Sequence, residues 1–162
     1  MDFVTSTNTL EHIPEPDVRL VLAECRRLLR PGGALSCRID LRDHYSYFDR
    51  SLSHYNFLRY SRHAWRLANS PLMHQNRLRY PDYLDAFTDA GFELMVVRAA
   101  KPRPRQLERL KGLRIAPEQQ RYSLEELGAP SLRLVARPAP EAGLTTRCEG
   151  ARRSPRATPP VG

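Results

Sequence analysis

The fold is decided by the stretch Asp2-Phe3-Val4-Thr5-Ser6-Thr7-Asn8-Thr9-Leu10-Glu11-His12-Ile13-Pro14. Its first five residues form a short apolar and β-branched run, and three polar residues follow at once. This pattern is typical of a buried strand that ends in a loop. The sequence therefore predicts that the chain opens inside a strand, and that Glu11 and His12 lie in the loop after it.

A helix and a second strand are expected next. Pro14-Glu15-Pro16-Asp17 has the composition of a helix start, because proline suits the first helical position and an acidic residue favours the helix dipole. Pro31-Gly32-Gly33 should end this helix. From Ala34 to Asp40, apolar and polar residues alternate with the period of a strand.

The rest of the chain divides into an insert, a helix and two strands. Leu41 to Arg79 is rich in aromatic and basic residues and lacks glycine, and we expect one or two helices that cover a cleft. A helix should begin at Tyr80-Pro81-Asp82 and end at Gly91, and Phe92 to Ala99 should be a strand. After a charged connection over 101–128, Ser131 to Arg137 is expected to pair with that strand.

The net charge of +8 belongs to the end of the chain. Residues 1–100 hold 13 basic and 12 acidic residues, whereas residues 101–162 hold 13 basic and 6 acidic ones, with 9 of the 14 prolines. We therefore predict a domain over residues 1–137 and a disordered Arg/Pro-rich tail over 138–162. Nucleic-acid binding is not expected, because the excess charge lies in residues 101–162 and not in the domain's first hundred residues.

The sequence shows no membrane or disulfide signal. No apolar run approaches the roughly 20 residues of a membrane span, and the first residues do not resemble a signal peptide. The three cysteines are widely spaced, which predicts reduced thiols and no zinc site of the Cys-x-x-Cys type. The expected location is cytoplasmic.

The order of these elements resembles the class I S-adenosylmethionine (SAM)-dependent methyltransferases, from their fourth strand onward. The resemblance covers residues 1 to about 100 and rests on Asp2-Phe3-Val4-Thr5-Ser6, Leu10-Glu11-His12-Ile13-Pro14, Leu28-Leu29-Arg30-Pro31-Gly32-Gly33 and Asp89-Ala90-Gly91-Phe92. It implies an α/β fold: a partial Rossmann-like sheet with a helical lid or acceptor insert over residues 41–79. The first strand and its Gly-rich turn would lie before Met1, and the chain contains no Gly-x-Gly-x-x-Gly motif.

The resemblance implies SAM as the cofactor, held in an incomplete site. In this family the cofactor lies beyond the carboxyl ends of the central strands. Ser6, Thr7, Asn8 and Leu10 would contact it, with His12 near the reacting methyl group. His12 is the candidate catalytic base, since a neutral imidazole can accept a proton from a hydroxyl or amine. The alternative is that His12 only shapes the loop.

The resemblance also bears on metal and acceptor binding. Some ubiquinone-pathway members bind a divalent metal through a Glu-x-x-Glu-His loop, but Asn8 stands where the first glutamate would fall, so no metal is expected. A small-molecule or glycan-type acceptor is expected to contact the insert. The candidate acceptor residues are His44, Tyr47, Tyr55, Arg59 and Arg77, although the aromatic ones are also explained as the buried stripe of a lid helix.

Two functions remain open. The first is SAM-dependent methyl transfer by a truncated or incomplete enzyme, whose unpaired first strand would invite self-association. The second is a noncatalytic methyltransferase remnant that binds protein or nucleic acid.

Overall fold

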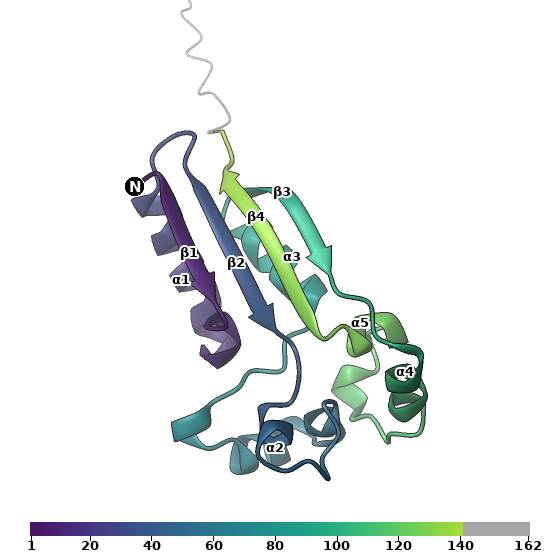
Figure 1. Ribbon diagram of the computed structural model, residues 1–162. Helices are drawn as coiled ribbons and strands as arrows, with labels where there is room; N and C mark the ends of the chain where they lie inside the picture. The colour runs from purple at the N-terminus through teal and green to yellow at the C-terminus, as the bar shows by residue number, and fades with distance from the viewer. Residues whose placement is uncertain (141–162) are drawn as a thin grey trace, which may run out of the picture.

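Four strands pair into one sheet in the order β1-β2-β4-β3 in the computed structural model, which describes residues 1–140 (Figure 1). The strands β1 and β2 are parallel, whereas β4 is antiparallel to both of its neighbours. The bounds of the strands are β1 Phe3–Thr7, β2 Ala34–Asp40, β3 Phe92–Ala99 and β4 Ser131–Pro138. The predicted α/β class and the predicted pairing of the last two strands are confirmed.

Two helices cover one face of the sheet, α1 (Glu15–Leu28) and α3 (Tyr80–Asp89) (Figure 1). They bury the alternate side chains of the strands, because successive residues of a strand point to opposite faces. In β2, Leu35, Cys37 and Ile39 are buried while Ser36 and Arg38 are exposed. The core thus lies between this face and the two helices, and the other face carries no helix within residues 1–140.

The ends of the elements follow the local chemistry of the sequence. Proline stands in the first turn of α1 and again in that of α3. Gly91 ends α3 with φ +78°, a left-handed conformation that glycine adopts without strain. A Cβ atom at Gly33 would lie 3.0 Å from the carbonyl oxygens of Asp2 and Arg30, so this turn has no room for a side chain.

The insert over 41–79, predicted to hold one or two helices, contains one short helix, α2 (Arg62–Ala68). It also contains several 3₁₀ turns, in which polar side chains cap backbone amides. The charged connection over 101–128, for which no helix was predicted, contains α4 (Pro104–Lys111) and α5 (Leu124–Gly128). The two segments pack together in a second apolar cluster made of Tyr55, Phe57, Leu58, Trp65, Leu110 and Leu127.

The predicted tail begins slightly too early. Pro138 is the last residue of β4 and stands opposite Phe92, and the amide of Ala139 donates a hydrogen bond to the carbonyl of Gly91. Pairing with β3 extends β4 to Pro138, one residue beyond the predicted end of the strand at Arg137. The proline-rich composition of this segment did not indicate that pairing. The remainder of the predicted tail, residues 141–162, lies outside the described residues. No helix within residues 1–140 is long and apolar enough to cross a membrane.

A buried arginine joins the two apolar clusters. The Arg79 side chain is fully buried, and its guanidinium donates hydrogen bonds to the carbonyls of Leu41, Leu127 and Ala129 at 2.8–3.0 Å, with a longer one to Glu126. Burial lowers the pKa of Arg79 to about 10, which still leaves the group charged at neutral pH. One cation therefore holds the end of β2, the start of α3 and the end of α5 together.

We predict that Arg79→Met lowers the free energy of unfolding by at least about 3 kcal/mol, because several buried carbonyls lose their donor. Urea unfolding followed by circular dichroism measures this. Arg66→Met, at an exposed position of α2, is the matched control and should change the stability by less than about 0.5 kcal/mol. Equal effects of the two substitutions would contradict the role of Arg79.

Candidate functional site

The candidate site lies beyond the carboxyl ends of the parallel strands β1 and β2. The chain leaves β1 into a 3₁₀ turn, Leu10–His12, and leaves β2 toward a second 3₁₀ turn, His44–Tyr47. Parallel pairing places both exits at the same edge of the sheet. The rings of His12 and His44 consequently lie 4.9 Å apart, although 31 residues separate them along the chain.

Glu11 is the buried carboxylate of the site. Its side chain is only 1% exposed, and its Oε1 accepts a hydrogen bond of 3.2 Å from the amide of Asp40. The other oxygen, Oε2, is buried and has no hydrogen-bond partner among the described residues. Burial raises the pKa of this carboxyl group, because the charged form loses its hydration. Glu11 thus ties the loop after β1 to the end of β2 and leaves one oxygen unsatisfied.

His12 is exposed, and one of its ring nitrogens is fixed. Its Nδ1 lies 2.8 Å from the carbonyl oxygen of His74. Since a carbonyl can only accept, Nδ1 carries the proton and Nε2 keeps its lone pair in the neutral ring. That nitrogen is available to accept a proton or to bind a cation.

His44 is buried beside His12. Its ring stacks on Tyr47 at 5.3 Å between centroids, and its backbone amide donates to Oε1 of Gln75. Its Nε2 is buried without a hydrogen-bond partner in the described part of the chain, and the nearest carboxylate oxygen in an ion-pair contact is Oδ2 of Asp40, at 3.9 Å. Burial lowers the pKa of His44, which favours the neutral ring.

Asp40 is an anion held by two neighbours. Burial tends to raise the pKa of this carboxyl group, but hydrogen bonds from Arg42 and from the Tyr47 hydroxyl outweigh that effect, and the pKa is lowered. The Tyr47 hydroxyl donates to Oδ2 at 2.5 Å, and Arg42 binds both oxygens. Asp40 therefore fixes the orientation of Tyr47 over His44.

The loop that carries Glu11 and His12 is anchored by Asn76. The Asn76 amide nitrogen Nδ2 donates to the carbonyls of Leu10 and Ile13 at 2.8 Å, and its backbone amide donates to the carbonyl of Glu11. Its Oδ1 accepts from the buried Tyr83 hydroxyl. The roles of Asp40, Gln75 and Asn76 were not predicted from the sequence. For Gln75 and Asn76 the available signal was a pair of adjacent amide residues just before the apolar pattern of α3.

The four predicted cofactor residues lie at the end of β1, which includes Ser6 and Thr7, and in the loop after it. Thr7 and Asn8 are exposed, Ser6 is half-buried, and the Leu10 side chain belongs to the main core. Asn8 has φ 52°, a left-handed conformation that asparagine tolerates better than most residues, and its amide donates to the carbonyl of Arg38. The chain turns away from the sheet at this residue.

The predicted acceptor residues fall into two groups. His44 and Tyr47 join His12 in the site. Tyr55 is buried in the second apolar cluster, where its hydroxyl donates to the carbonyl of Gly128. Arg77 pairs with Glu118 and lies over the Trp65 ring, and exposed Arg59 contacts Asn56 at 3.4 Å. These last three residues are thus engaged in the packing of the insert.

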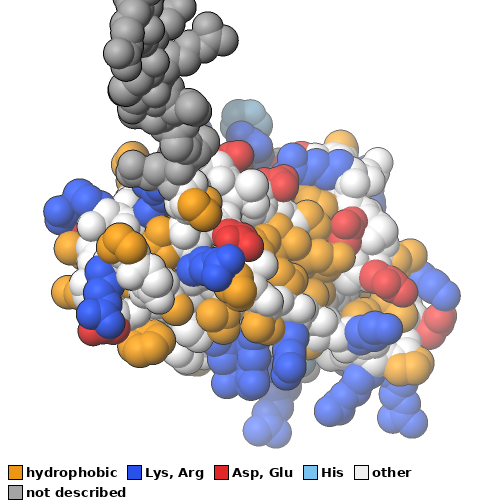
Figure 2. Space-filling model, turned by 90° about the horizontal axis from the view of Figure 1, so that it is seen from above, with side chains coloured by type: hydrophobic (Ala, Val, Ile, Leu, Met, Phe, Trp, Pro, Cys, Tyr) orange, Lys and Arg blue, Asp and Glu red, His pale blue; other side chains and the backbone are white. Residues whose placement is uncertain are grey.

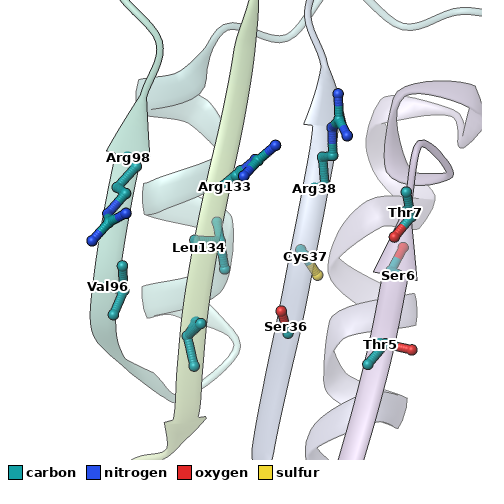
Figure 3. Close-up of a pocket in the computed structure, with 11 residues that line it drawn as sticks. Thr5, Ser6, Thr7, Ser36, Cys37, Arg38, Val96, Arg98, Arg133 and Leu134 are labelled. Atoms are coloured by element: carbon teal, nitrogen blue, oxygen red, sulfur yellow. The ribbon is translucent and has the colours of Figure 1, made fainter.

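A separate hollow of about 430 Å³ lies on the sheet face that carries no helix (Figure 3). Arg38, Arg133 and Arg98 stand directly opposite one another on β2, β4 and β3. All three are exposed, and no acidic side chain of residues 1–140 forms an ion pair with them. Seen from above, basic side chains also project along one side of the molecule (Figure 2).

We predict that Asn76→Ala loosens the loop before it affects the sheet, because the carbonyls of Leu10 and Ile13 lose their donor. Amide hydrogen exchange followed by mass spectrometry should show faster exchange over residues 8–14 and unchanged exchange in β2. Arg66→Ala should leave both regions unchanged. Equal acceleration in the loop and in β2 would show a global effect instead of a local anchor.

Comparison with known proteins finds a similarity to one family in the first part of the chain. A family profile described as a methyltransferase domain matches residues 1–37, which span β1, the loop with Glu11 and His12, α1 and half of β2. No curated protein matches the chain.

Solved structures with similar folds include three related to methyltransferases. They are the complex between the Haloferax volcanii Trm112 methyltransferase activator and the putative methyltransferase (17% identity, TM-score 0.48), a putative methyltransferase from Bacillus halodurans (17%, 0.48) and a SAM-dependent methyltransferase from Mesorhizobium loti (18%, 0.47). The matches cover 88%, 86% and 84% of this chain, but only 55%, 64% and 61% of the respective chains. Over residues 1–37 the chain is therefore similar to a methyltransferase domain, and for this segment the predicted resemblance to methyltransferases is confirmed.

Proposed function

We propose that the chain takes part in SAM-dependent methyl transfer to a small-molecule or glycan-type acceptor. The observation that carries this proposal is the methyltransferase-domain match over residues 1–37, because it includes the whole loop from Ser6 to His12. The clustering of His12, His44 and Tyr47 at the carboxyl end of β1 and β2 is consistent with an acceptor side to the same site.

The residues present fit one wall of a SAM site. Thr7 and Asn8 expose polar groups where the chain turns away from the sheet, and they would bind the cofactor together with Ser6 and the backbone at Leu10. Bound SAM supplies a sulfonium methyl group that is already activated for transfer. We further propose that this site is incomplete, since the chain has no Gly-rich turn to form the opposite wall.

The chain's own residues would position the acceptor and remove its proton. His12 Nε2 is exposed with a lone pair, because Nδ1 donates to the carbonyl of His74. Tyr47 and His44 form a stacked pair beside it, and Asp40 fixes the tyrosine hydroxyl. A hydroxyl or amine held near Tyr47 would thus meet a fixed base, which is the alignment that methyl transfer requires.

We predict that the chain alone binds SAM weakly, with a Kd of about 1 mM or above, because one wall of a pocket excludes little water. Isothermal titration calorimetry with SAM and S-adenosylhomocysteine measures this. Asn8→Val should weaken the binding further by straining the left-handed turn, whereas Asn8→Gly keeps the turn and separates backbone from side-chain effects. Tight binding by a monodisperse monomer would contradict the incomplete site.

Self-association is part of the same proposal. The strand β1 pairs with β2 only, so its other edge presents unpaired backbone groups within residues 1–140. A second copy would cover that edge. Light scattering, which is needed to show that the calorimetry sample is monomeric, also detects this association.

A second candidate function is a noncatalytic module that binds an acidic partner. The row formed by Arg38, Arg133 and Arg98 favours it, because like charges directly opposite one another in a sheet destabilise it unless an anion lies between them. This candidate uses the sheet face in place of the predicted Arg/Pro-rich tail.

We predict that replacing all three arginines by glutamine weakens the binding of a labelled poly-glutamate peptide at least about tenfold at low salt, with little effect at high salt. Fluorescence anisotropy measures the affinity. The matched control replaces three other exposed arginines, Arg50, Arg62 and Arg66, and should bind like the unaltered chain. Loss of binding on deleting residues 141–162 alone would assign the interaction to the tail and contradict the role of the sheet face.

A further inference from the structure

We propose that Glu11, His12 and His44 form a binding site for a divalent cation of the Zn²⁺ class. Each of the three residues offers one ligand atom, and these atoms all lie within 4.8 Å of one another. Ligands of a filled tetrahedral zinc site are about 3.3 Å apart, so the three side chains must close by about 1.5 Å at most. The His12 side chain is exposed, so it can make most of this movement by turning about its Nδ1 contact with the carbonyl of His74.

Two buried atoms point to a missing ligand. Glu11 is 1% exposed and His44 9% exposed, and each carries one buried polar atom without a hydrogen-bond partner among residues 1–140, Oε2 and Nε2 respectively. An unsatisfied polar atom in the interior costs free energy. A cation between them would satisfy both atoms and the carboxylate charge at once.

Hydrogen bonds to His12 and Glu11 orient the free atoms of these two residues as ligands. His12 Nδ1 donates to the carbonyl of His74, which leaves the Nε2 lone pair for a metal. Glu11 Oε1 accepts from the amide of Asp40, which leaves Oε2. Such second contacts, one for each ligating histidine or carboxylate, are the usual surroundings of a protein-bound metal.

The ligand types select the metal. Two imidazole nitrogens and one carboxylate oxygen suit zinc and its neighbours in the transition series, whereas magnesium and calcium prefer oxygen ligands alone. Three protein ligands leave a fourth position toward solvent on the side of His12, which is the arrangement of a reactive zinc site and not of a closed structural one.

The site was not expected from the sequence, because a carboxylate is lacking at Asn8. The structure brings His44 to the same loop from the far end of β2, and this ligand takes the place of the missing one. The proposal does not depend on methyl transfer. With the cation bound, the single lone pair of His12 Nε2 is occupied, and His12 cannot act as the base.

The test titrates the full chain, stripped of metal by EDTA, with Zn²⁺ in competition with a chromophoric chelator. We expect one ion per chain and a raised Tm in its presence. The variants E11Q, H12Q and H44Q should each weaken binding at least about tenfold, and H63Q, at an exposed position of α2, should leave it unchanged. In E11Q the side-chain oxygen can still accept the hydrogen bond from the Asp40 amide, and H12Q changes only an exposed side chain. At least one informative variant should therefore fold normally.

Co²⁺ provides an independent signal. Visible absorption bands of tetrahedral intensity, without a thiolate band in the near ultraviolet, would support nitrogen and oxygen ligands and exclude Cys25 and Cys37. Absence of saturable Zn²⁺ binding, or binding that E11Q and H12Q leave unchanged, would overturn the proposal and leave a water molecule as the partner of the two buried atoms. SAM titration of the same variants keeps this result distinct from the proposed methyl transfer.

Discussion

The buried guanidinium of Arg79 is the interaction on which the arrangement of the described residues depends. It is placed at the start of α3, and it binds carbonyls at the end of β2 and at the end of α5. The carbonyl of Leu41 lies just after β2, where the insert begins, and those of Leu127 and Ala129 lie at the end of α5. Burying these carbonyls without donors would cost free energy, and one guanidinium supplies hydrogen bonds to all of them. Arg79 thereby fixes the position of the second apolar cluster relative to the sheet.

The same short segment also builds the site. Gln75 and Asn76, just before Arg79, bind the backbone at His44 and the loop from Leu10 to Ile13. Both exits from the parallel strands are therefore held by neighbouring residues of a third segment. This explains why the rings of His12 and His44 lie only 4.9 Å apart even though one residue is exposed and the other buried. The geometry that supports either a base or a metal ligand is a consequence of that anchoring.

The two faces of the sheet have opposite characters. One is buried by α1 and α3, while the other exposes Arg38, Arg133 and Arg98 in a row. Alternation along β2 and β4 maintains this division, because a shift of one residue would exchange the faces. In β3 a register shift between Leu94 and Val96 interrupts the alternation. The site at the carboxyl ends and the row of arginines are consequently separate features, and the two proposed functions use different surfaces.

Much of the sheet followed from local pattern. The alternation in Ala34–Asp40 and the apolar run in Phe92–Ala99 defined β2 and β3 to the residue, and proline and glycine marked the ends of α1 and α3. The insert was harder, because its side chains cap turns and do not repeat with a helical period. Arg77 and Tyr55 were natural acceptor candidates by composition, yet the fold engages them in packing.

By itself, the sequence determined the four strands, the helices α1 and α3 and the loop with Glu11 and His12, and with them the α/β class, since these depend on patterns within short segments. Only the tertiary structure decided which distant residues meet that loop. Parallel pairing of β1 with β2 brought His44 to His12, and burial left Glu11 Oε2 and His44 Nε2 without partners. Such properties arise from contacts between segments far apart in the chain, and no local pattern encodes them.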